Sequence, residues 1–492
     1  MARSSSTPAP PSARCSDRAA AALAFAAALA FLLATHFAFL DLPYHWDELG
    51  YYVPAARDLF VSGALVPSST LPNVHPPLVM AYLAGAWKLF GFSIPVTRLA
   101  MLVLAAAVLA AAFVLARRLS GTRSAIVAAA LLAVSPPFVA QSMLAHLDLP
   151  ATLWVLLSLC WFLEDRLWLC ALAATALTLT KETGVIVPAL LLILGRGRRE
   201  RLLPLALPFV ALAAWLLFLH AQTGHWLGSA EFERYNLAEA PGPGRALLVL
   251  LRRLYQLGIA NFHWIGLLVL WRGQGLAAGE RPLAVILAAY LVLHSLIGGA
   301  ILFRYVLPAL ALFYILVAPR LRGVALAALF AGLVVSNWWK PPYPFSYEDN
   351  LAVVDFVRLQ QQAAQWLSEH AAGRTITTAW PLTDALTNPL LGYVTQPLRV
   401  EPVSNFQLPG KFAFMSADVV ALYSRAWEPE RGWQRWPPAA RLLERYFAYQ
   451  PQISPQELQS RFHLRPVIRW ERHGQWMMIL TAADSPARPG PN

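Results

Sequence analysis

Residues 99–116 read LAMLVLAAAVLAAAFVLA, and Arg117 and Arg118 follow at once. An uncharged run of this length is about what one helix needs to cross the hydrocarbon core of a bilayer. The whole chain has the same character, since 58% of its 492 residues are hydrophobic, only 13% are charged and the mean hydropathy is +0.49. Average soluble domains carry about 25% charged residues. The composition therefore excludes a water-soluble enzyme and predicts a polytopic membrane protein.

Eleven apolar runs are candidate transmembrane helices, and several are shorter than the roughly 20 residues of an upright span. The first is too long for the apolar region of a signal peptide and lacks a convincing cleavage site, so we expect an uncleaved helix. The runs are Ala19–Leu40, Leu99–Ala116, Ser124–Gln141, Leu149–Leu163, Leu167–Thr180, Gly184–Leu194, Leu202–Leu219, Ile259–Trp271, Leu283–Ile301, Tyr305–Ala318 and Val324–Trp338.

The charges between these runs predict the orientation. Lys and Arg collect in cytoplasmic loops, and five of the six loops on one side are strongly or purely basic. This side holds the N-terminal tail, predicted to be disordered over residues 1–18, and the other side holds everything after Trp339. We therefore expect a cytoplasmic N-terminus and an extracytoplasmic C-terminus in a cell membrane, a bacterial inner membrane being the natural setting. The basic cytoplasmic loops also account for the net charge of +12, so we expect no nucleic acid as a partner.

Residues 41–97 form an outer segment too long for a simple connection. It contains Asp47-Glu48 and His75-Pro76-Pro77-Leu78, and we expect two helices lying along the outer membrane surface. A carboxylate this close to the hydrocarbon is expensive unless it is used or paired. We assign the chemistry to Asp47 and a supporting contact to Glu48, although an acidic helix cap is the simpler interpretation of this pair.

Further polar groups fall at the same outer level by charge alternation alone. His146 and Asp148 stand in the next outer turn, where Asp148 has the position of a helix cap. Lys181-Glu182 separates two apolar runs. Arg304, before Tyr305, interrupts another and needs an anion, either a protein carboxylate or a phosphate. Together these groups predict a site for an anionic ligand that approaches from the lipid.

The three cysteines show no metal-ligand spacing and no disulfide framework. We therefore expect no cofactor. Asp47, His146 and Asp148 could share a divalent cation, a version that we do not favour.

After Trp339 the apolar runs stop, and the proline-rich residues 340–344 predict a stiff linker. Residues 341–481 are expected to form a small extracytoplasmic α/β domain, with a helix over Asp355–His370, a strand over Arg374–Trp380 and a hairpin over Val467–Thr481. We expect this domain to cover the site or to help choose the acceptor, and residues 482–492 to be disordered. The fold class is mainly α.

Several of these motifs, in their order and spacing, resemble the GT-C membrane glycosyltransferases over roughly residues 19–340. The most similar subgroup contains the protein O-mannosyltransferases and the bacterial aminoarabinose transferase of lipid A. The motifs are Asp47-Glu48, His75-Pro76-Pro77-Leu78, Arg98-Leu99, Asp148-Leu149-Pro150, Thr180-Lys181-Glu182-Thr183-Gly184 and Arg304-Tyr305-Val306-Leu307-Pro308.

The resemblance implies an inverting glycosyltransferase that takes a sugar from a polyprenyl-phosphate donor on the non-cytoplasmic side. It implies that Asp47 is the catalytic base, accepting the proton of an acceptor hydroxyl on a lipid, glycan or protein. The aminoarabinose-type enzymes have lysine where this chain has His75. We expect the donor phosphate to be held by His75, Lys181, Arg304 and Tyr305, with Glu48 and Asp148 assisting Asp47 and with Tyr51, Tyr52, His146 and Glu182 lining the pocket.

Two other functional classes remain open at this stage. A transporter or flippase for lipid-linked sugars would place charges at mid-bilayer depth and pair broken helices in two repeated halves. Here the charges gather at one rim, and the sequence contains no evident internal repeat. A structural subunit with relic motifs is the other alternative, and only an assay separates it from an enzyme.

Overall fold

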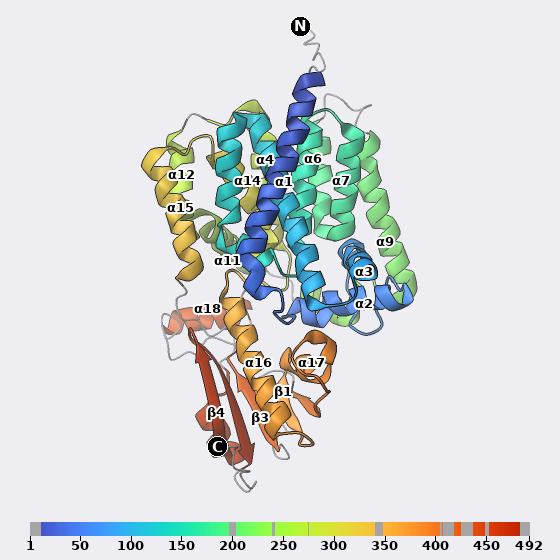
Figure 1. Cartoon of the computed structure of the whole chain (residues 1–492), viewed down its shortest axis with the longest axis vertical. Helices are drawn as coiled ribbons and strands as arrows, with labels where there is room; N and C mark the ends of the chain where they lie inside the picture. Colours follow the sequence, from blue (N-terminus) through green and yellow to red (C-terminus); the bar gives the residue numbers. More distant parts are fainter. Residues whose placement is uncertain are drawn as a thin grey trace.

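The protein is described by a computed structural model, which covers residues 11–195, 203–238, 242–273, 275–339, 348–403, 406, 418–424, 436–447 and 452–482. The predicted linker at 340–344, the basic loop at 196–201 and residues 483–492 of the predicted disordered end 482–492 lie outside the described residues, whereas Ala482 is the last residue of a strand. A bundle of helices occupies one end of the molecule and a small sheet with its own helices the other (Figure 1).

The N-terminal half of the bundle begins earlier than predicted. Helix α1 starts at Pro11, because proline is tolerated in a first helical turn and the following residues permit a helix. Gly121, with φ of +82°, breaks α4 beside Arg117, Arg118 and Arg123, where the sequence places a cytoplasmic loop. The helices of this half are α1 Pro11–His36, α4 Ile94–Ala133, α5 Pro136–Gln141, α6 Asp148–Leu163, α7 Leu167–Thr180, α8 Ile186–Leu194 and α9 Leu207–Thr223.

The C-terminal half of the bundle contains a bent pair of helices. The pair Pro243–Gly258 and Ala260–Arg272 bends by 54°, and its first helix, α11, buries Arg253 and Gln256 on one face. The helices are α11 Pro243–Gly258, α12 His263–Arg272, α13 Arg281–Leu296, α14 Leu307–Val317 and α15 Gly323–Trp338.

Four helical stretches among the described residues are long and apolar enough to cross a membrane, and the bent pair makes a fifth if it is one broken span. The four are Arg18–Phe39, Ile94–Ala133, Leu203–Thr223 and Ala278–Leu296. Six further apolar helices are shorter. The count of eleven spans therefore stays a prediction.

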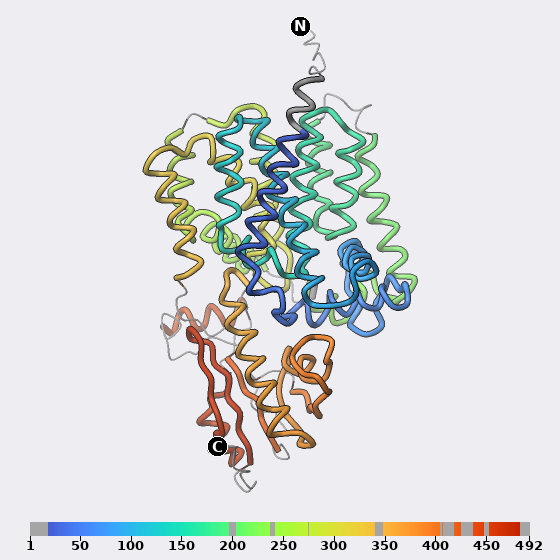
Figure 2. Tube along the Cα trace, in the orientation of Figure 1, coloured from blue at the N-terminus to red at the C-terminus, as the bar shows by residue number. Residues whose placement is uncertain are grey.

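The outer segment contains short helices at the level where the bundle meets the sheet. They are η2 (Glu48–Tyr52), α2 (Val53–Ser62) and α3 (Leu78–Phe90), and the tube in Figure 2 shows α2 and α3 beside the outer end of α9. Helix α3 begins directly after Pro76-Pro77, as the proline signal predicts. After α9 in the chain, α10 (Ala230–Glu233) and η5 (Arg234–Ala238) precede α11.

The C-terminal sheet has the strand order β2-β1-β3-β5-β4. Strand β1 pairs in parallel with β2 and β3, whereas β5 is antiparallel to both β3 and β4. The predicted helix, first strand and hairpin correspond to α16 (Ala352–His370), β1 (Ile376–Ala379), β4 (Leu464–Arg472) and β5 (Gln475–Ala482). The remaining elements are α17 Leu382–Thr387, β2 Val400–Val403, β3 Val419–Tyr423, α18 Pro437–Phe447 and α19 Pro455–Phe462.

A buried arginine joins three segments at the outer end of the bundle. Arg98, in the first turns of α4, is fully buried and pairs with Glu48. Its guanidinium also donates to the carbonyls of Leu42, Pro43 and Met143, at 2.8 to 3.2 Å. Removing one member of a buried pair leaves the other charge uncompensated, which costs about 3–5 kcal/mol.

We expect Arg98→Ala to lower the free energy of unfolding in detergent by about 3–5 kcal/mol, because it leaves Glu48 and three carbonyls without their donor. The control is Lys88→Ala, which removes an exposed cation from the neighbouring helix α3 and should change stability by less than about 0.5 kcal/mol. Equal losses in the two variants would contradict the structural role of Arg98.

Candidate functional site

The predicted acids and bases of the outer rim meet around Arg304. This arginine lies in the short helix η8 (Phe303–Val306), directly before α14, and its side chain is only 1% exposed. Its Nη2 donates to Asp47, whose side chain is 18% exposed. Its Nε lies 3.5 Å from Asp148 Oδ2 and its Nη1 lies 3.1 Å from Glu348 Oε2. Asp47 is therefore the half-open member of a cluster that is otherwise buried.

Some N–H groups of Arg304 are not hydrogen-bonded to these carboxylates. Its Nε and Nη1 are buried and make no hydrogen bond with the described residues, since the geometry toward Asp148 and Glu348 is that of a charge contact only. A guanidinium presents five N–H donors in a fixed fork that suits a phosphate or carboxylate. The site thus retains donors for an anion beyond those that the protein supplies.

Lys181 forms the second cationic corner of the cluster. It stands at the break between α7 and η3 (Glu182–Val185), and its Nζ donates to Asp148 Oδ1 at 2.6 Å. The same ammonium lies 4.1 Å from the centre of the Tyr305 ring, within cation–π range. Asp148 is the first residue of α6, whose N-cap is Leu147 and not Asp148 as predicted, and its carboxylate contacts Lys181 and Arg304.

His75 and Glu182 form a separate pair. His75 Nδ1 lies 2.7 Å from Glu182 Oε2, and the ring of His75 lies 6.1 Å from that of Tyr52. Tyr52 in turn contacts the ring of His146 at 6.0 Å, so it stands between this pair and the main cluster. His75 is therefore engaged by a carboxylate, and the resemblance-based contact of this residue with a donor phosphate stays a prediction. Tyr51, Tyr52 and His75 line one small cavity.

Glu48 does not share the cluster of its neighbour Asp47. It is fully buried, and its carboxylate accepts from Arg98, from the amide of His45 at 3.1 Å and from the amide of Ala145 at 2.5 Å. The carboxylate oxygens of Glu48 are therefore fully used by hydrogen bonds within the protein. Glu48 thus contacts Arg98 and two backbone amides and not the cluster at Arg304, and the supporting contact assigned to it stays a prediction.

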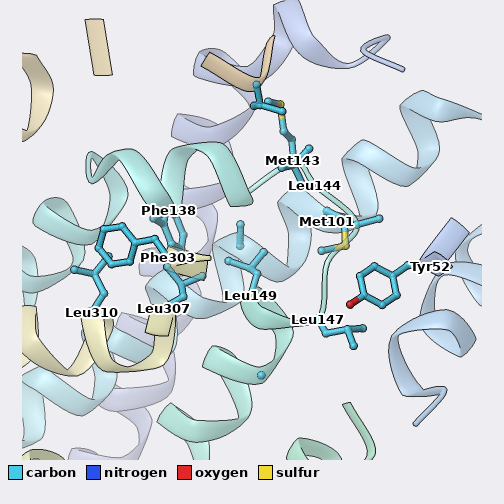
Figure 3. Close-up of a cluster of buried hydrophobic side chains, with 14 of the residues drawn as sticks. Tyr52, Met101, Phe138, Met143, Leu144, Leu147, Leu149, Phe303, Leu307 and Leu310 are labelled. Carbon is cyan, nitrogen blue, oxygen red and sulfur yellow. The ribbon is translucent and has the colours of Figure 1, made fainter. Parts of the chain in front are cut away.

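An apolar layer surrounds the turn that carries His146 and Asp148. The side chains of Met143, Leu144, Leu147 and Leu149 from this turn pack among residues of α4, α5 and α14, as Figure 3 shows. Burial in such surroundings strengthens each electrostatic contact of the neighbouring polar groups. It also lowers the pKa of His146 well below its usual value, so His146 is neutral and bonds to Gln141 at 2.9 Å.

The sequence analysis missed Glu348. This residue precedes α16 and adopts a positive φ of 60°, and its carbonyl accepts a hydrogen bond from the Gln141 side chain at 3.1 Å. Burial raises the pKa of its carboxyl to about 8, despite the opposing charge of Arg304. With Glu348 protonated, the charges of Arg304 and Lys181 balance those of Asp47 and Asp148. Only its position after a membrane span and a proline-rich stretch set it apart in the sequence.

No group of three His, Cys, Asp or Glu side chains in the described part of the chain is arranged to hold a metal ion. The cation shared by Asp47, His146 and Asp148 therefore gains no support from the geometry. The nitrogen of His146 that faces the site, Nε2, lies 3.8 Å from Glu348 Oε1.

The chain resembles known proteins in part of its sequence and in its fold. The family model of dolichyl-phosphate-mannose-protein mannosyltransferases matches residues 74–227, a segment that includes His75, Asp148 and Lys181 but neither Asp47 nor Arg304. A search of curated protein sequences finds no significant match.

Among solved structures, ArnT from Cupriavidus metallidurans bound to undecaprenyl phosphate matches with a TM-score of 0.56 at 14% identity, over 95% of this chain and 99% of that chain. The apo state of the same protein matches with a TM-score of 0.55 at 14% identity and the same coverage. At this identity the likeness shows the fold. The fold and the family model over residues 74–227 both agree with the resemblance to the GT-C membrane glycosyltransferases predicted from the sequence motifs.

The raised pKa of Glu348 predicts a specific dependence of stability on pH. A carboxyl with a pKa of about 8 in the folded protein and 4.5 in the unfolded chain stabilises the fold fully below pH 4.5. This stabilisation is lost as the pH rises toward 8. Glu348→Gln keeps the shape and removes the titration.

We therefore expect the melting temperature of the wild type to fall, relative to that of Glu348→Gln, between pH 5 and pH 8.5, as measured in detergent. Glu369→Gln, which changes an exposed glutamate on α16, is the matched control and should follow the wild type. A constant difference in melting temperature between wild type and Glu348→Gln would contradict the protonated state of Glu348.

Proposed function

We propose that the chain transfers a sugar from a polyprenyl-phosphate donor to an acceptor hydroxyl on the extracytoplasmic side, with inversion at the anomeric carbon. The observation that carries the proposal is the contact of Asp47 with Arg304, a buried arginine that keeps unused donors. Undecaprenyl phosphate is the ligand of the ArnT structure that shares this fold, which supports a polyprenyl phosphate as the donor carrier.

Asp47 acts as the general base in this mechanism. Its carboxylate accepts the proton of the acceptor hydroxyl while that oxygen attacks the anomeric carbon, and the bond from this carbon to the phosphate oxygen breaks. The partial exposure of the Asp47 side chain leaves room for an acceptor, whereas Asp148 and Glu348 are buried. These differences support Asp47, and not its neighbours, as the group that meets the acceptor.

Arg304 and Lys181 stabilise the departing prenyl phosphate, which leaves with one more negative charge than it had in the donor. Tyr305 packs against the ammonium of Lys181. Because His75 is paired with Glu182, the phosphate is bound by the two stronger cations, Arg304 and Lys181. Asp148 holds Lys181 and faces Arg304, so its role is to position both.

Arg304 couples the two halves of the reaction. In the free protein its Nη2 serves Asp47. When Asp47 accepts a proton its hold on the guanidinium weakens, while the phosphate gains a charge and holds it more strongly. The total charge around Arg304 stays constant through the step, so the transfer itself adds no uncompensated charge to the buried site.

The alternation of basic loops supports the extracytoplasmic side, because it predicts that the 41–97 segment lies opposite the N-terminus. The alternative of a transporter gains no support, since the charged groups of the site gather at one end of the bundle.

We expect Asp47→Asn to lower the rate of sugar transfer by about 10²–10⁴, because the amide keeps the shape of the carboxylate and loses its basicity. The assay follows radiolabelled sugar from polyprenyl-phosphate sugars into lipid, glycan and protein fractions of membranes that contain the full chain. Asp41→Asn, an exposed acid of the same outer segment, is the control and should transfer at the wild-type rate. Transfer by Asp47→Asn at the wild-type rate would remove Asp47 from the mechanism.

A further inference from the structure

The C-terminal sheet sends one aromatic side chain to the catalytic segment. Trp380 follows β1 at the end of that strand, and its ring lies 4.6 Å from the ring of Trp46 in an edge-to-face arrangement. The ring of Tyr51 lies 6.5 Å from the ring of Trp380. Trp46 directly precedes Asp47, and Tyr51 follows it by one helical turn. Three aromatic rings therefore surround the outer approach to the proposed base.

The indole of Trp380 is held in place by contacts from both parts of the molecule. A Cβ at Gly50 would come within 2.8 Å of the indole, so the bare backbone of η2 packs directly against it. The Asp384 side chain, from α17, hydrogen-bonds to Trp380. The Tyr423 hydroxyl donates to the Trp380 carbonyl at 2.6 Å. The ring is thus positioned in advance, and it is only half-buried.

The two sides of Asp47 face different surroundings. Arg304 reaches Asp47 from the helical bundle, where the donor phosphate binds in the proposed mechanism. Trp380 reaches the residues beside Asp47 from the C-terminal sheet, which lies beyond the end of the bundle (Figure 1). An in-line displacement requires the nucleophile to enter opposite the leaving group. The aromatic rings therefore lie on the side from which the acceptor enters.

Half-exposed aromatic rings beside carboxylates match one class of acceptor particularly well. A sugar ring presents a face of apolar C–H groups, which packs on an aromatic face, and hydroxyls at its edge, which donate to carboxylates. Here the carboxylates are those of Asp47 and Asp384, and Tyr51 adds a hydroxyl.

We propose that Trp380, Trp46 and Tyr51 form an acceptor subsite that stacks against a sugar ring, so that the acceptor is a glycan or a glycolipid. This inference rests on the proposed function, because it identifies the acceptor side from the place of the donor phosphate. It also gives the C-terminal sheet a defined part in the reaction, since that sheet supplies the central ring of the subsite.

The test is saturation-transfer NMR on the full chain in nanodiscs, with a panel of methyl hexopyranosides and methyl pentopyranosides and a Ser/Thr-rich peptide as probes. We expect at least one methyl glycoside to receive saturation through its ring C–H protons and the peptide to receive none. Trp380→Ala should weaken binding of that glycoside about tenfold, and Trp380→Phe should restore part of it because a ring remains. Trp436→Ala, an exposed tryptophan of the same C-terminal region, is the matched control and should bind as the wild type does.

The outcomes separate this inference from the proposed function. Unchanged glycoside binding in Trp380→Ala, or saturation of the peptide alone, would overturn the subsite, and a melting temperature measured for each variant identifies any loss of folding. Asp41→Asn, which changes an exposed acid outside the subsite, should keep the glycoside signal. If glycoside binding depends on Trp380 while no polyprenyl-phosphate sugar is ever consumed, the subsite stands and the proposed reaction fails.

Discussion

The buried pair of Arg98 and Glu48 is the constraint on which the outer end of the molecule depends. One guanidinium binds a carboxylate and three carbonyls, and the carboxylate in turn binds two amides. The segment after α1, the start of α4 and the turn before α6 are thereby held at one point. Asp47 is adjacent to this point in the chain, and Asp148 follows the same turn. Because every polar group of this network is hydrogen-bonded, the network fixes the distance between Asp47 and Asp148.

The C-terminal sheet is attached at the same place. The Tyr44 hydroxyl and the Thr97 hydroxyl share a hydrogen bond of 2.7 Å, next to Arg98. The Tyr44 carbonyl accepts from the hydroxyl of Tyr393, a residue of the sheet region, at 2.9 Å. Glu348 and Trp380 are brought to Asp47 from this region on two sides. The site is therefore composite, with its cations on the bundle and part of its lining on the sheet.

The sequence predicted which residues of the bundle would meet, because membrane topology assigns each residue between two helices to one side of the membrane or the other. Charge alternation assigns Asp47, Asp148, Lys181 and Arg304 to one side, and burial near hydrocarbon requires such charges to find one another. This argument does not predict which charged side chains form pairs. In the structure Arg98 pairs with Glu48, and Arg304 pairs with Asp47. Glu348 and Trp380 belong to the part of the chain whose fold depends on strand pairing between distant segments, which local pattern does not specify. The predicted start of α1 was wrong for a local reason, since its first residues form a helix as readily as a tail.

The charge balance explains why such a site is compatible with a stable protein. Two cations face three carboxylates, and the burial of Glu348 is tolerable because its raised pKa keeps it protonated near neutral pH. An arriving phosphate diester adds one negative charge at the guanidinium atoms that have no hydrogen-bond partner. Glu348 Oε2, at 3.1 Å from Nη1, occupies part of that space, so donor binding and the position of Glu348 are linked. Glu348 lies four residues before α16, the helix that packs against strands β4 and β5 of the sheet.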